Sequence, residues 1–218
     1  MERTGACGAR VAYGRAAGVL VLACCHAAFG QAPGMGHWIS EVSTQDGDSI
    51  VEPGETATVK LWMDMNPSVG EMLPDGTSVH AFDAGVFDII GRDGADLGVI
   101  QGWQINMYLA AGMDGSTDGV SIFDVGLVQI PPNDFSDPIF LLSFEWEPDA
   151  YEPFQASYEP FVDVPDKGVG FLLWKSDGTN ELWPADQHEI VISVVPSPSV
   201  LAAIGLAALS RVWSRDRQ

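Results

Sequence analysis

Residues 56–65 read TATVKLWMDM and residues 140–147 read FLLSFEWE, and both stretches alternate between two kinds of side chain. A period of two is typical of a β-strand, because successive side chains point to opposite faces of a sheet. The apolar positions that share a face are Ala57, Val59, Leu61 and Met63 in the first stretch, and Phe140, Leu142, Phe144 and Trp146 in the second. Each pattern predicts a strand with one face in a core and the other outside it.

The same pattern, with β-branched and aromatic enrichment, predicts further strands between Gly- and Pro-rich turns such as QDGD, LPDG, MDGSTDG and IPPND. No internal window keeps a helical period over three turns. We therefore predict an all-β domain, an antiparallel β-sandwich with jelly-roll or immunoglobulin-like connections. The predicted strands lie near residues 38–43, 56–65, 79–90, 97–108, 120–130, 139–147, 154–162, 168–175 and 189–195.

The first thirty residues are typical of a secretory signal peptide. Three arginines precede an apolar run from Ala16 to Ala28, and small residues follow, so we expect a signal helix in residues 1–30 and cleavage after Gly30. A lipoprotein is the alternative, since VLAC ending at Cys24 resembles a loose lipobox. All three cysteines lie in this segment, and the expected mature chain therefore has no disulfide.

The charge is concentrated in the middle of the chain. Of the 30 acidic residues, 28 lie between residues 31 and 196, together with only four of the ten basic residues, which gives this span a formal net charge of −24. A field of this sign repels nucleic acid and favours cations or basic partners. We exclude nucleic acid as a partner and expect one domain over residues 31–195.

A calcium site is the one candidate cofactor site. In residues 114–124, DGSTDGVSIFD, the residues Asp114, Ser116 and Asp118 match the first places of a calcium loop, but the twelfth place is Val125. An EF-hand is therefore excluded. An irregular Ca²⁺ site with Asp114, Asp118 and Asp124 as ligands stays open, and turn-forming aspartates in a solvated loop are the favoured interpretation.

Catalysis has one weak candidate. Glu145 and Glu147 lie two residues apart and therefore share a strand face. This spacing resembles that of the catalytic carboxylates on one strand of laminarinase-type jelly-roll glycosidases. Pro148 follows where that family projects a third carboxylate, so we favour a solvated acidic face and no enzymatic activity.

Aromatic side chains suggest a carbohydrate-binding alternative, because sugars stack on exposed indoles. Trp146 and Trp174 lie in apolar strands and are predicted core residues. The candidates for exposed indoles are Trp38, Trp62, Trp103 and Trp183, and extracellular polysaccharide is the ligand that they would imply.

The C-terminal residues 196–218 form a proline-framed step, a short apolar helix and a basic end. The ten apolar residues 200–209 would span about 15 Å as a helix, against about 30 Å of bilayer hydrocarbon, so we expect transient membrane insertion rather than a lasting anchor. The helix residues are Val200, Leu201, Ile204, Leu206 and Leu209, and the basic residues are Arg211, Arg215 and Arg217. An ordinary single-span anchor or an amphipathic docking helix is the alternative.

This arrangement resembles the PEP-CTERM sorting signal, in which Val-Pro-Glu-Pro-Ser/Thr precedes the helix. The matching residues are Val195, Pro196, Pro198 and Ser199, and Ser197 stands where that family has Glu. The resemblance implies an exosortase-type sorting enzyme and the export machinery as partners. In the body, VEPGETATVKLW followed by FDAGVFDIIG is similar to the opening strands of cohesin-like sandwiches.

These features together predict an exported structural or adhesive protein without enzymatic activity. We expect it at the cell envelope, the cell surface or in the extracellular matrix, with a transient or retained C-terminal membrane helix. A carbohydrate-binding module is the alternative, and a jelly-roll glycosidase the third hypothesis.

Overall fold

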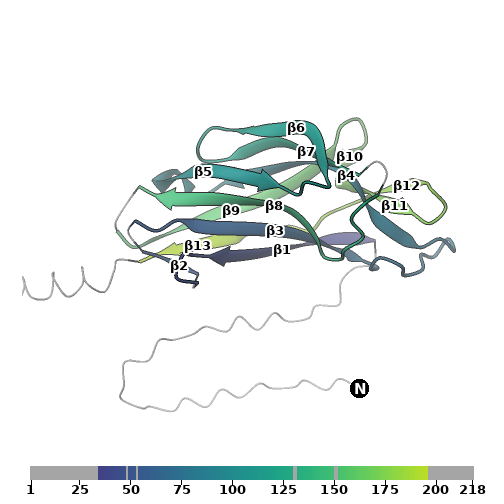
Figure 1. Ribbon diagram of the computed structural model, residues 1–218, viewed down its shortest axis with the longest axis horizontal. Helices are drawn as coiled ribbons and strands as arrows, with labels where there is room; N and C mark the ends of the chain where they lie inside the picture. Colours follow the sequence, from purple (N-terminus) through teal and green to yellow (C-terminus); the bar gives the residue numbers. More distant parts are fainter. Residues whose placement is uncertain (1–33, 48, 53, 130–131, 150–151, 196–218) are drawn as a thin grey trace, which may run out of the picture. The chain divides into compact units, whose positions relative to one another are not determined.

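A computed structural model describes residues 34–47, 49–52, 54–129, 132–149 and 152–195, with the backbone alone at residues 110–114 (Figure 1). Within these residues the fold is all-β, as the alternation predicts. The elements are β1 (Met35–Ser43), β2 (Ile50–Val51), β3 (Ala57–Asn66), β4 (Val79–Gly91), the 3-10 helix η1 (Ala95–Leu97), β5 (Gly98–Ile105), β6 (Ala110–Thr117), β7 (Ile122–Val128), β8 (Ile139–Pro148), β9 (Phe154–Val164), β10 (Gly168–Val169), β11 (Phe171–Lys175), β12 (Asn180–Trp183) and β13 (Ile190–Val194).

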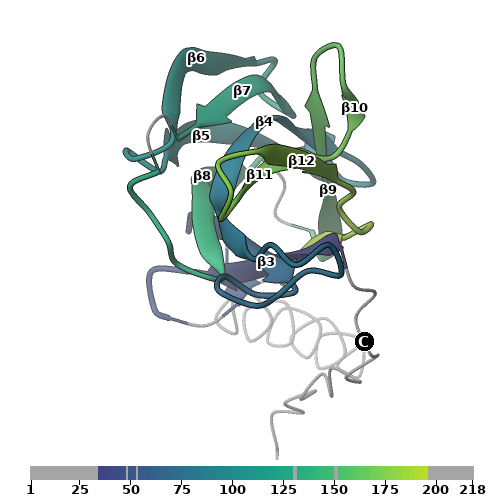
Figure 2. The ribbon, with the colours of Figure 1, turned by 90° about the vertical axis from the view of Figure 1, so that its right-hand side faces the viewer.

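The strands form two packed sheets (Figure 2). Sheet A has the order β1-β3-β8-β5, and sheet B contains β12-β11-β4-β9-β13-β2, with β7 paired to β4, β6 to β7 and β10 to β9. Pairing is antiparallel throughout the described strands except between β13 and β2, which are parallel. The predicted antiparallel sandwich is therefore confirmed.

The core lies between the inner faces of the sheets. Aromatic pairs join the two layers: Trp38 of β1 meets Phe87 of β4 edge-on at 5.8 Å, and Phe144 of β8 lies 5.2 Å from Tyr158 of β9. The predicted inner face of β3 is confirmed, since its four apolar residues are fully buried: Ala57, Val59, Leu61 and Met63. Burial of this apolar surface is the main stabilising contribution to a sandwich of this kind.

Three short or irregular strands were not predicted: β2, β6 and β12. In β6 the sequence AAGMDGST lacks the alternation that marks a half-buried strand. The predicted strand 168–175 is instead divided into β10 and β11 at Gly170, whose φ is +130°. A Cβ atom at Gly170 would lie 2.2 Å from the Trp183 carbonyl oxygen, so this position requires glycine.

The described residues contain no helix long and apolar enough to cross a membrane, since η1 is their only helix. The expected signal helix in residues 1–30 and the C-terminal hydrophobic helix lie outside the described residues.

Residues 184–189, between β12 and β13, run along the free edge of β1. The Gly36 N–H donates to the Pro184 carbonyl, and the Asp186 N–H donates back to the Gly36 carbonyl. The Asp186 carboxylate accepts from the Trp38 N–H at 3.0 Å and contacts His37 Nδ1 at 3.1 Å. This segment therefore ties sheet B to the edge of sheet A.

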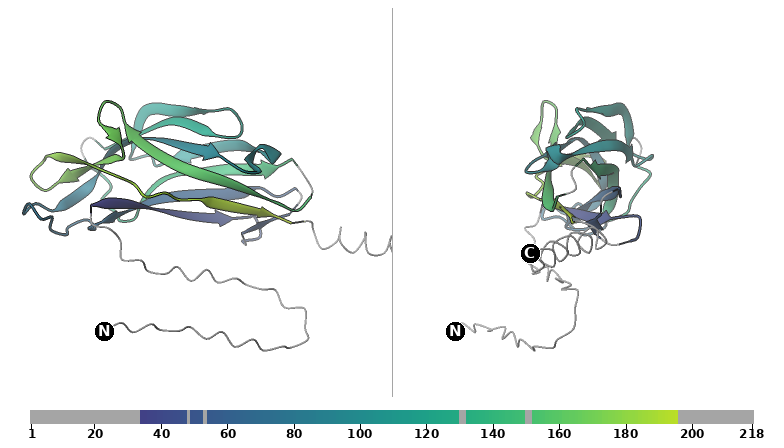
Figure 3. Two further views of the ribbon diagram at one scale, coloured as in Figure 1. Left: turned by 180° about the vertical axis from the view of Figure 1, so that it is seen from behind. Right: turned by 90° about the vertical axis from the view of Figure 1, so that its left-hand side faces the viewer.

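The described chain enters and leaves the sandwich at opposite ends, as seen from behind in Figure 3. Met35 at the start of β1 pairs with Asn66 at the end of β3, whereas Val194 at the end of β13 pairs with Val51, shortly before β3 begins. The ten residues of β3 therefore separate the two ends.

Candidate functional site

The outer face of sheet A carries a row of apolar side chains that lie across neighbouring strands. Ile39 of β1 is opposite Trp62 of β3, and Trp62 is opposite Phe140 of β8. The Trp62 and Phe140 rings meet edge-on, with centroids 5.7 Å apart. Ile39 is 39% exposed, and the two aromatic side chains are half-buried. We call Ile39, Trp62 and Phe140 the apolar row.

Phe140 joins this row because of a β-bulge. The sequence placed Phe140 on the inner face with Leu142, and that prediction is wrong. The register between β3 and β8 shifts after Leu61, which pairs with Leu142, so that Trp62 pairs with Phe140. Leu141 is the extra residue and is buried with Leu142. The bulge reverses which side of β8 faces outward beyond this point.

The turn after β5 carries two further exposed apolar side chains. Met107 is 78% exposed and Tyr108 is 58% exposed. The buried Asn106 fixes this turn, because its side-chain amide donates to the Phe140 carbonyl at 2.8 Å and to Asp134 at 3.1 Å. Its side-chain oxygen accepts from the Tyr108 N–H at 3.0 Å. The amide therefore ties this turn to the backbone of β8 at Phe140.

The following rows on the same face are polar. Glu41 lies opposite Lys60, which lies opposite Ser143 and then Gln104. Here a depression of about 330 Å³ opens between β3, β8 and β5. Its lining residues are Thr58, Lys60, Gly102, Trp103, Gln104, Ser143, Phe144 and Glu145. The outer face of sheet A, which we call face A, thus combines the apolar row with a polar depression beside it.

The two glutamates considered for glycoside hydrolysis differ in surroundings. Glu145 lines the depression, but Glu147 is not among its lining residues and accepts a 3.0 Å hydrogen bond from the Gln101 side chain. Hydrolysis requires both carboxylates to flank one glycosidic bond. This depression does not provide that arrangement.

The four tryptophans considered for sugar binding are not exposed together on one surface. Trp38 and Trp183 are only 5% and 3% exposed, so their selection as surface residues is wrong. Trp146 is fully buried, as predicted, and the half-buried Trp174 donates its indole N–H to the Gln129 carbonyl. Of the four selected indoles only Trp62 lies on the outer face of sheet A. Trp103 is paired with the buried Phe144 and packs, partly buried, against the core, so its selection as a surface residue is also wrong.

The acidic loop before β7 bonds to its own backbone. The Asp118 carboxylate accepts from the Val120 and Ser121 N–H groups at 2.9 and 2.7 Å, and these bonds hold its pKa below the ordinary value. Asp124 has a φ of +58° and donates its N–H to Asp88. No group of three or more metal-ligating side chains occurs among the described residues, which do not include the Asp114 side chain. The Ca²⁺ site stays a prediction.

Of the sorting motif, only Val195 belongs to the described part of the chain. Its N–H donates to the Val51 carbonyl at 3.0 Å, directly after β13. Pro196, Ser197, Pro198 and Ser199, the apolar helix and the three terminal arginines lie outside the described residues.

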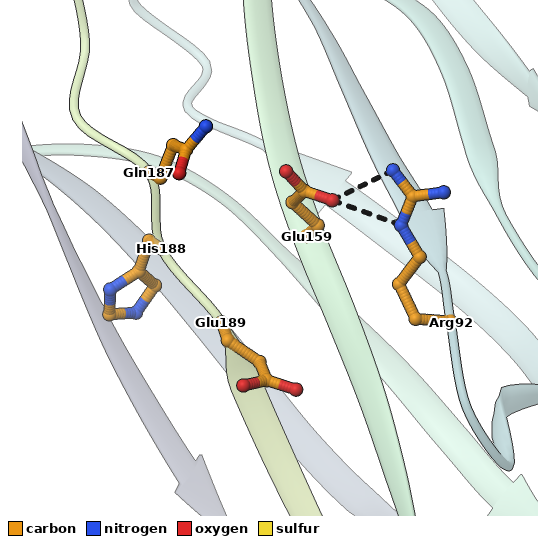
Figure 4. A pocket seen from close by; sticks show the side chains of 5 residues that line it. All are labelled: Arg92, Glu159, Gln187, His188 and Glu189. Atoms are coloured by element: carbon orange, nitrogen blue, oxygen red, sulfur yellow. Dashed lines mark hydrogen bonds and ion pairs between the residues drawn. The ribbon is translucent and has the colours of Figure 1, made fainter.

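Sheet B has a smaller, charged pocket of about 310 Å³ on its own surface (Figure 4). Arg92 donates from Nε and from a terminal nitrogen to one oxygen of Glu159, at 3.0 and 2.7 Å. Gln187, His188 and Glu189 complete the lining. Because this guanidinium is already paired and solvated, the pocket presents mainly acidic and amide groups.

Comparison with known proteins gives fold neighbours at low identity. No family model matches the sequence, and no curated protein matches it. One similar structure is the cohesin module of a family 33 glycoside hydrolase from Clostridium perfringens, 12% identical, with a TM-score of 0.48, covering 75% of this chain and 99% of that one.

Two further similar structures are cohesins determined in complexes. The sixth cohesin of scaffoldin B from Acetivibrio cellulolyticus, bound to a Cel5 dockerin mutant, is 8% identical with a TM-score of 0.40 and covers 72% of this chain and 99% of that one. The OlpC cohesin from Clostridium thermocellum, bound to Doc435, is 9% identical with a TM-score of 0.39 and covers 76% and 97%. These similarities concern the fold and not the ligands of those modules, while the resemblance to PEP-CTERM proteins stays a prediction.

Proposed function

We propose that this chain is an exported, non-enzymatic protein that binds a partner protein through the outer face of sheet A, as a structural or adhesive component of the cell surface. The observation that carries the proposal is the apolar row, in which Ile39, Trp62 and Phe140 are direct cross-strand neighbours on three strands of the sheet. Contiguous exposed apolar groups rimmed by polar residues are typical of protein-binding surfaces.

Charge restricts the chemistry of the partner. The domain carries a formal charge of −24, and Lys60 is the only basic residue in the strands of sheet A. Glu41 and Glu145 flank it on the same face. A partner with Lys or Arg around an apolar centre would therefore be attracted and oriented, and an acidic one would be repelled.

The proposal is tested by measuring which secreted and surface proteins of the producing organism are retained by this protein and by its variants. Trp62→Ser removes the centre of the apolar row and should abolish retention of the partner, since aromatic residues of this kind dominate binding energy at interfaces. Phe161→Ser is the matched control, because Phe161 is 40% exposed on the outer face of sheet B. Equal retention by wild type and both variants would contradict the proposal.

A polysaccharide is the second candidate ligand, and the depression on face A favours it. The lining of the depression contains the hydrogen-bonding residues Thr58, Gln104 and Glu145, and also part of Trp103, whose half-buried side chain packs against the core beneath. Titration with matrix polysaccharide should quench indole fluorescence in the wild type and not in Trp103→Ala. A response that survives in that variant would remove this candidate.

The C-terminal residues are proposed to act as a sorting address processed by an exosortase-type enzyme after export. Supporting this, Val195, the final described residue, still donates its N–H to the Val51 carbonyl, and the proline-framed step follows it in the sequence. Intact-mass measurement of surface-released protein should place the new C-terminus near Pro196–Ser199. Recovery of chains ending at Gln218 from the membrane fraction would contradict processing.

A further inference from the structure

A cleft of about 720 Å³ lies beyond the end of β3, separate from the depression on face A. One wall is the loop that follows β3, and the other is β12. The volume falls in the range of about 300–1,000 Å³ that small-ligand pockets occupy. The lining residues are Gly34, Pro67, Met72, Leu73, Pro74, Asp75, Glu181 and Trp183.

The interior of the cleft is apolar, and one of the apolar side chains that line it is exposed to solvent. Trp183 and Leu73 are 3% and 9% exposed, and two prolines lie beside them. Met72 is 66% exposed at the same site. Methionine adapts to ligands of different shape because its side chain is unbranched and polarizable.

Backbone hydrogen bonds to a carboxylate hold the loop wall in place. Asp137 accepts from the Met65 N–H at 2.9 Å and from the Val69 N–H at 3.0 Å. Within the loop, the Leu73 N–H donates to the Thr77 carbonyl at 2.7 Å. The cleft is therefore a formed feature of the fold, with its wall fixed on both sides of Pro67.

The charge that solvent can reach at the rim is negative. Lys175 contacts Asp75 and lies 3.4 Å from Glu181, so it bridges the two walls. Its side chain is only 10% exposed, whereas those of Asp75 and Glu181 are each 49% exposed. The cation is thus largely covered, and the two carboxylates face an approaching ligand.

We propose that this cleft binds a peptide segment that inserts one aliphatic or aromatic side chain beside a Lys or Arg. The apolar interior accepts the first side chain, and the exposed rim carboxylates attract the second. An acidic peptide would be repelled by these two carboxylates and by the field of a domain with charge −24. This site would give the protein a second contact, independent of the apolar row.

Methionine methyl signals provide a direct test. The exported protein, labelled with ¹³C-methyl methionine, is titrated with acetyl-Gly-Arg-Leu-Arg-Gly-amide and with the matched acetyl-Gly-Glu-Leu-Glu-Gly-amide. Met72 reports the cleft, Met107 reports the exposed turn after β5 outside it, and the buried Met63 and Met65 report the fold. We expect a saturable shift of Met72 with the arginine peptide only, weakened by salt, and no shift of Met107.

One conservative variant tests the role of the rim. Glu181→Gln should weaken binding of the arginine peptide about three- to fivefold, the effect of one exposed ion pair. Glu152→Gln, which removes an exposed acid outside the cleft and the apolar row, should leave the affinity unchanged. Unshifted Met63 and Met65 signals in both variants establish that the fold is retained.

Three outcomes would overturn the proposal. Met72 could stay unmoved at millimolar peptide, or it could respond equally to both peptides. It could also shift with protein concentration alone, which would assign the cleft to a second copy of the chain. Failure here leaves the test with Trp62→Ser unaffected, because that test measures a different surface.

Discussion

The outer faces of both sheets carry partly exposed apolar side chains, but these side chains have different cross-strand neighbours on the two sheets. On sheet A, Ile39, Trp62 and Phe140 are direct cross-strand neighbours. On sheet B, three successive outward pairs between β4 and β9 each combine an apolar residue with an acid: Val86 with Asp163, Phe161 with Asp88, and Ile90 with Glu159. Exposed apolar residues thus become a continuous surface only where cross-strand register aligns them.

The comparison depends first on the bulge that turns Phe140 outward. Phe144→Ala should cost about 3–5 kcal/mol in unfolding free energy, because the buried ring leaves a cavity in the core. Phe140→Ala should cost only about 1 kcal/mol, as expected of a partly exposed site. Urea unfolding of both variants measures this difference. Similar losses of unfolding free energy in the two variants would indicate that Phe140 is buried in the core and would contradict its outward position.

Coupling between neighbours sharpens the comparison further. A double-mutant cycle on Trp62 and Phe140 should give a favourable interaction of about 0.5–1.5 kcal/mol, typical of an edge-on aromatic pair. The same cycle on Phe161 and Asp88 should give a value close to zero, because a phenyl ring and a carboxylate gain little from proximity. Equal coupling on both sheets would remove the distinction between the faces.

One acid of sheet B breaks the pattern, since Asp83 of β4 is only 3% exposed and accepts a 3.1 Å hydrogen bond from Asn180. Burial raises the pKa of Asp83 above 3.8. In the pH range between 3.8 and the raised pKa, the folded chain holds a proton that the unfolded chain has lost. Stability should therefore fall as pH rises through that window.

Asp83→Asn cannot ionise and should not show this fall, so its stability relative to wild type should increase from pH 3.5 upward. Asp177 provides the opposite sign: the Thr179 hydroxyl and N–H lower the pKa of its carboxyl group. Its contribution is present above 3.8 and is lost as pH falls through the lowered pKa, so Asp177→Asn should be relatively less harmful in acid. Urea midpoints measured against pH test both signs.

The smallest effect is expected at the ion pair on sheet B. Arg92 and Glu159 have side chains 53% and 41% exposed. Arg92→Gln should therefore cost about 0.2–1 kcal/mol in low salt and less in high salt. A loss that stays the same in high salt would indicate a packing role for Arg92 instead of a charge effect.

Much of the fold could be predicted because alternation along β3 and β8 states directly which side chains are buried. The outward position of Phe140 could not, since the bulge inserts Leu141 between apolar neighbours and leaves no gap in the pattern. Trp183 lies outside every strand that the alternation predicts and is a candidate for an exposed indole, yet its strand β12 pairs with β11 and Trp183 is covered. The Asn106 side-chain bonds join residues 28 and 34 positions apart, which local sequence patterns do not reveal.

The exit of the chain through β13 determines how the sandwich responds to mechanical tension. β13 pairs with β9 on one side and with β2 on the other. It ends at the far end of the sandwich from the start of β1. Pulling the two ends of the described chain apart therefore loads these hydrogen bonds along the strands, where many must break together. We expect single-molecule pulling through these ends to need more force than pulling through the β9–β10 hairpin, whose bonds can open one at a time.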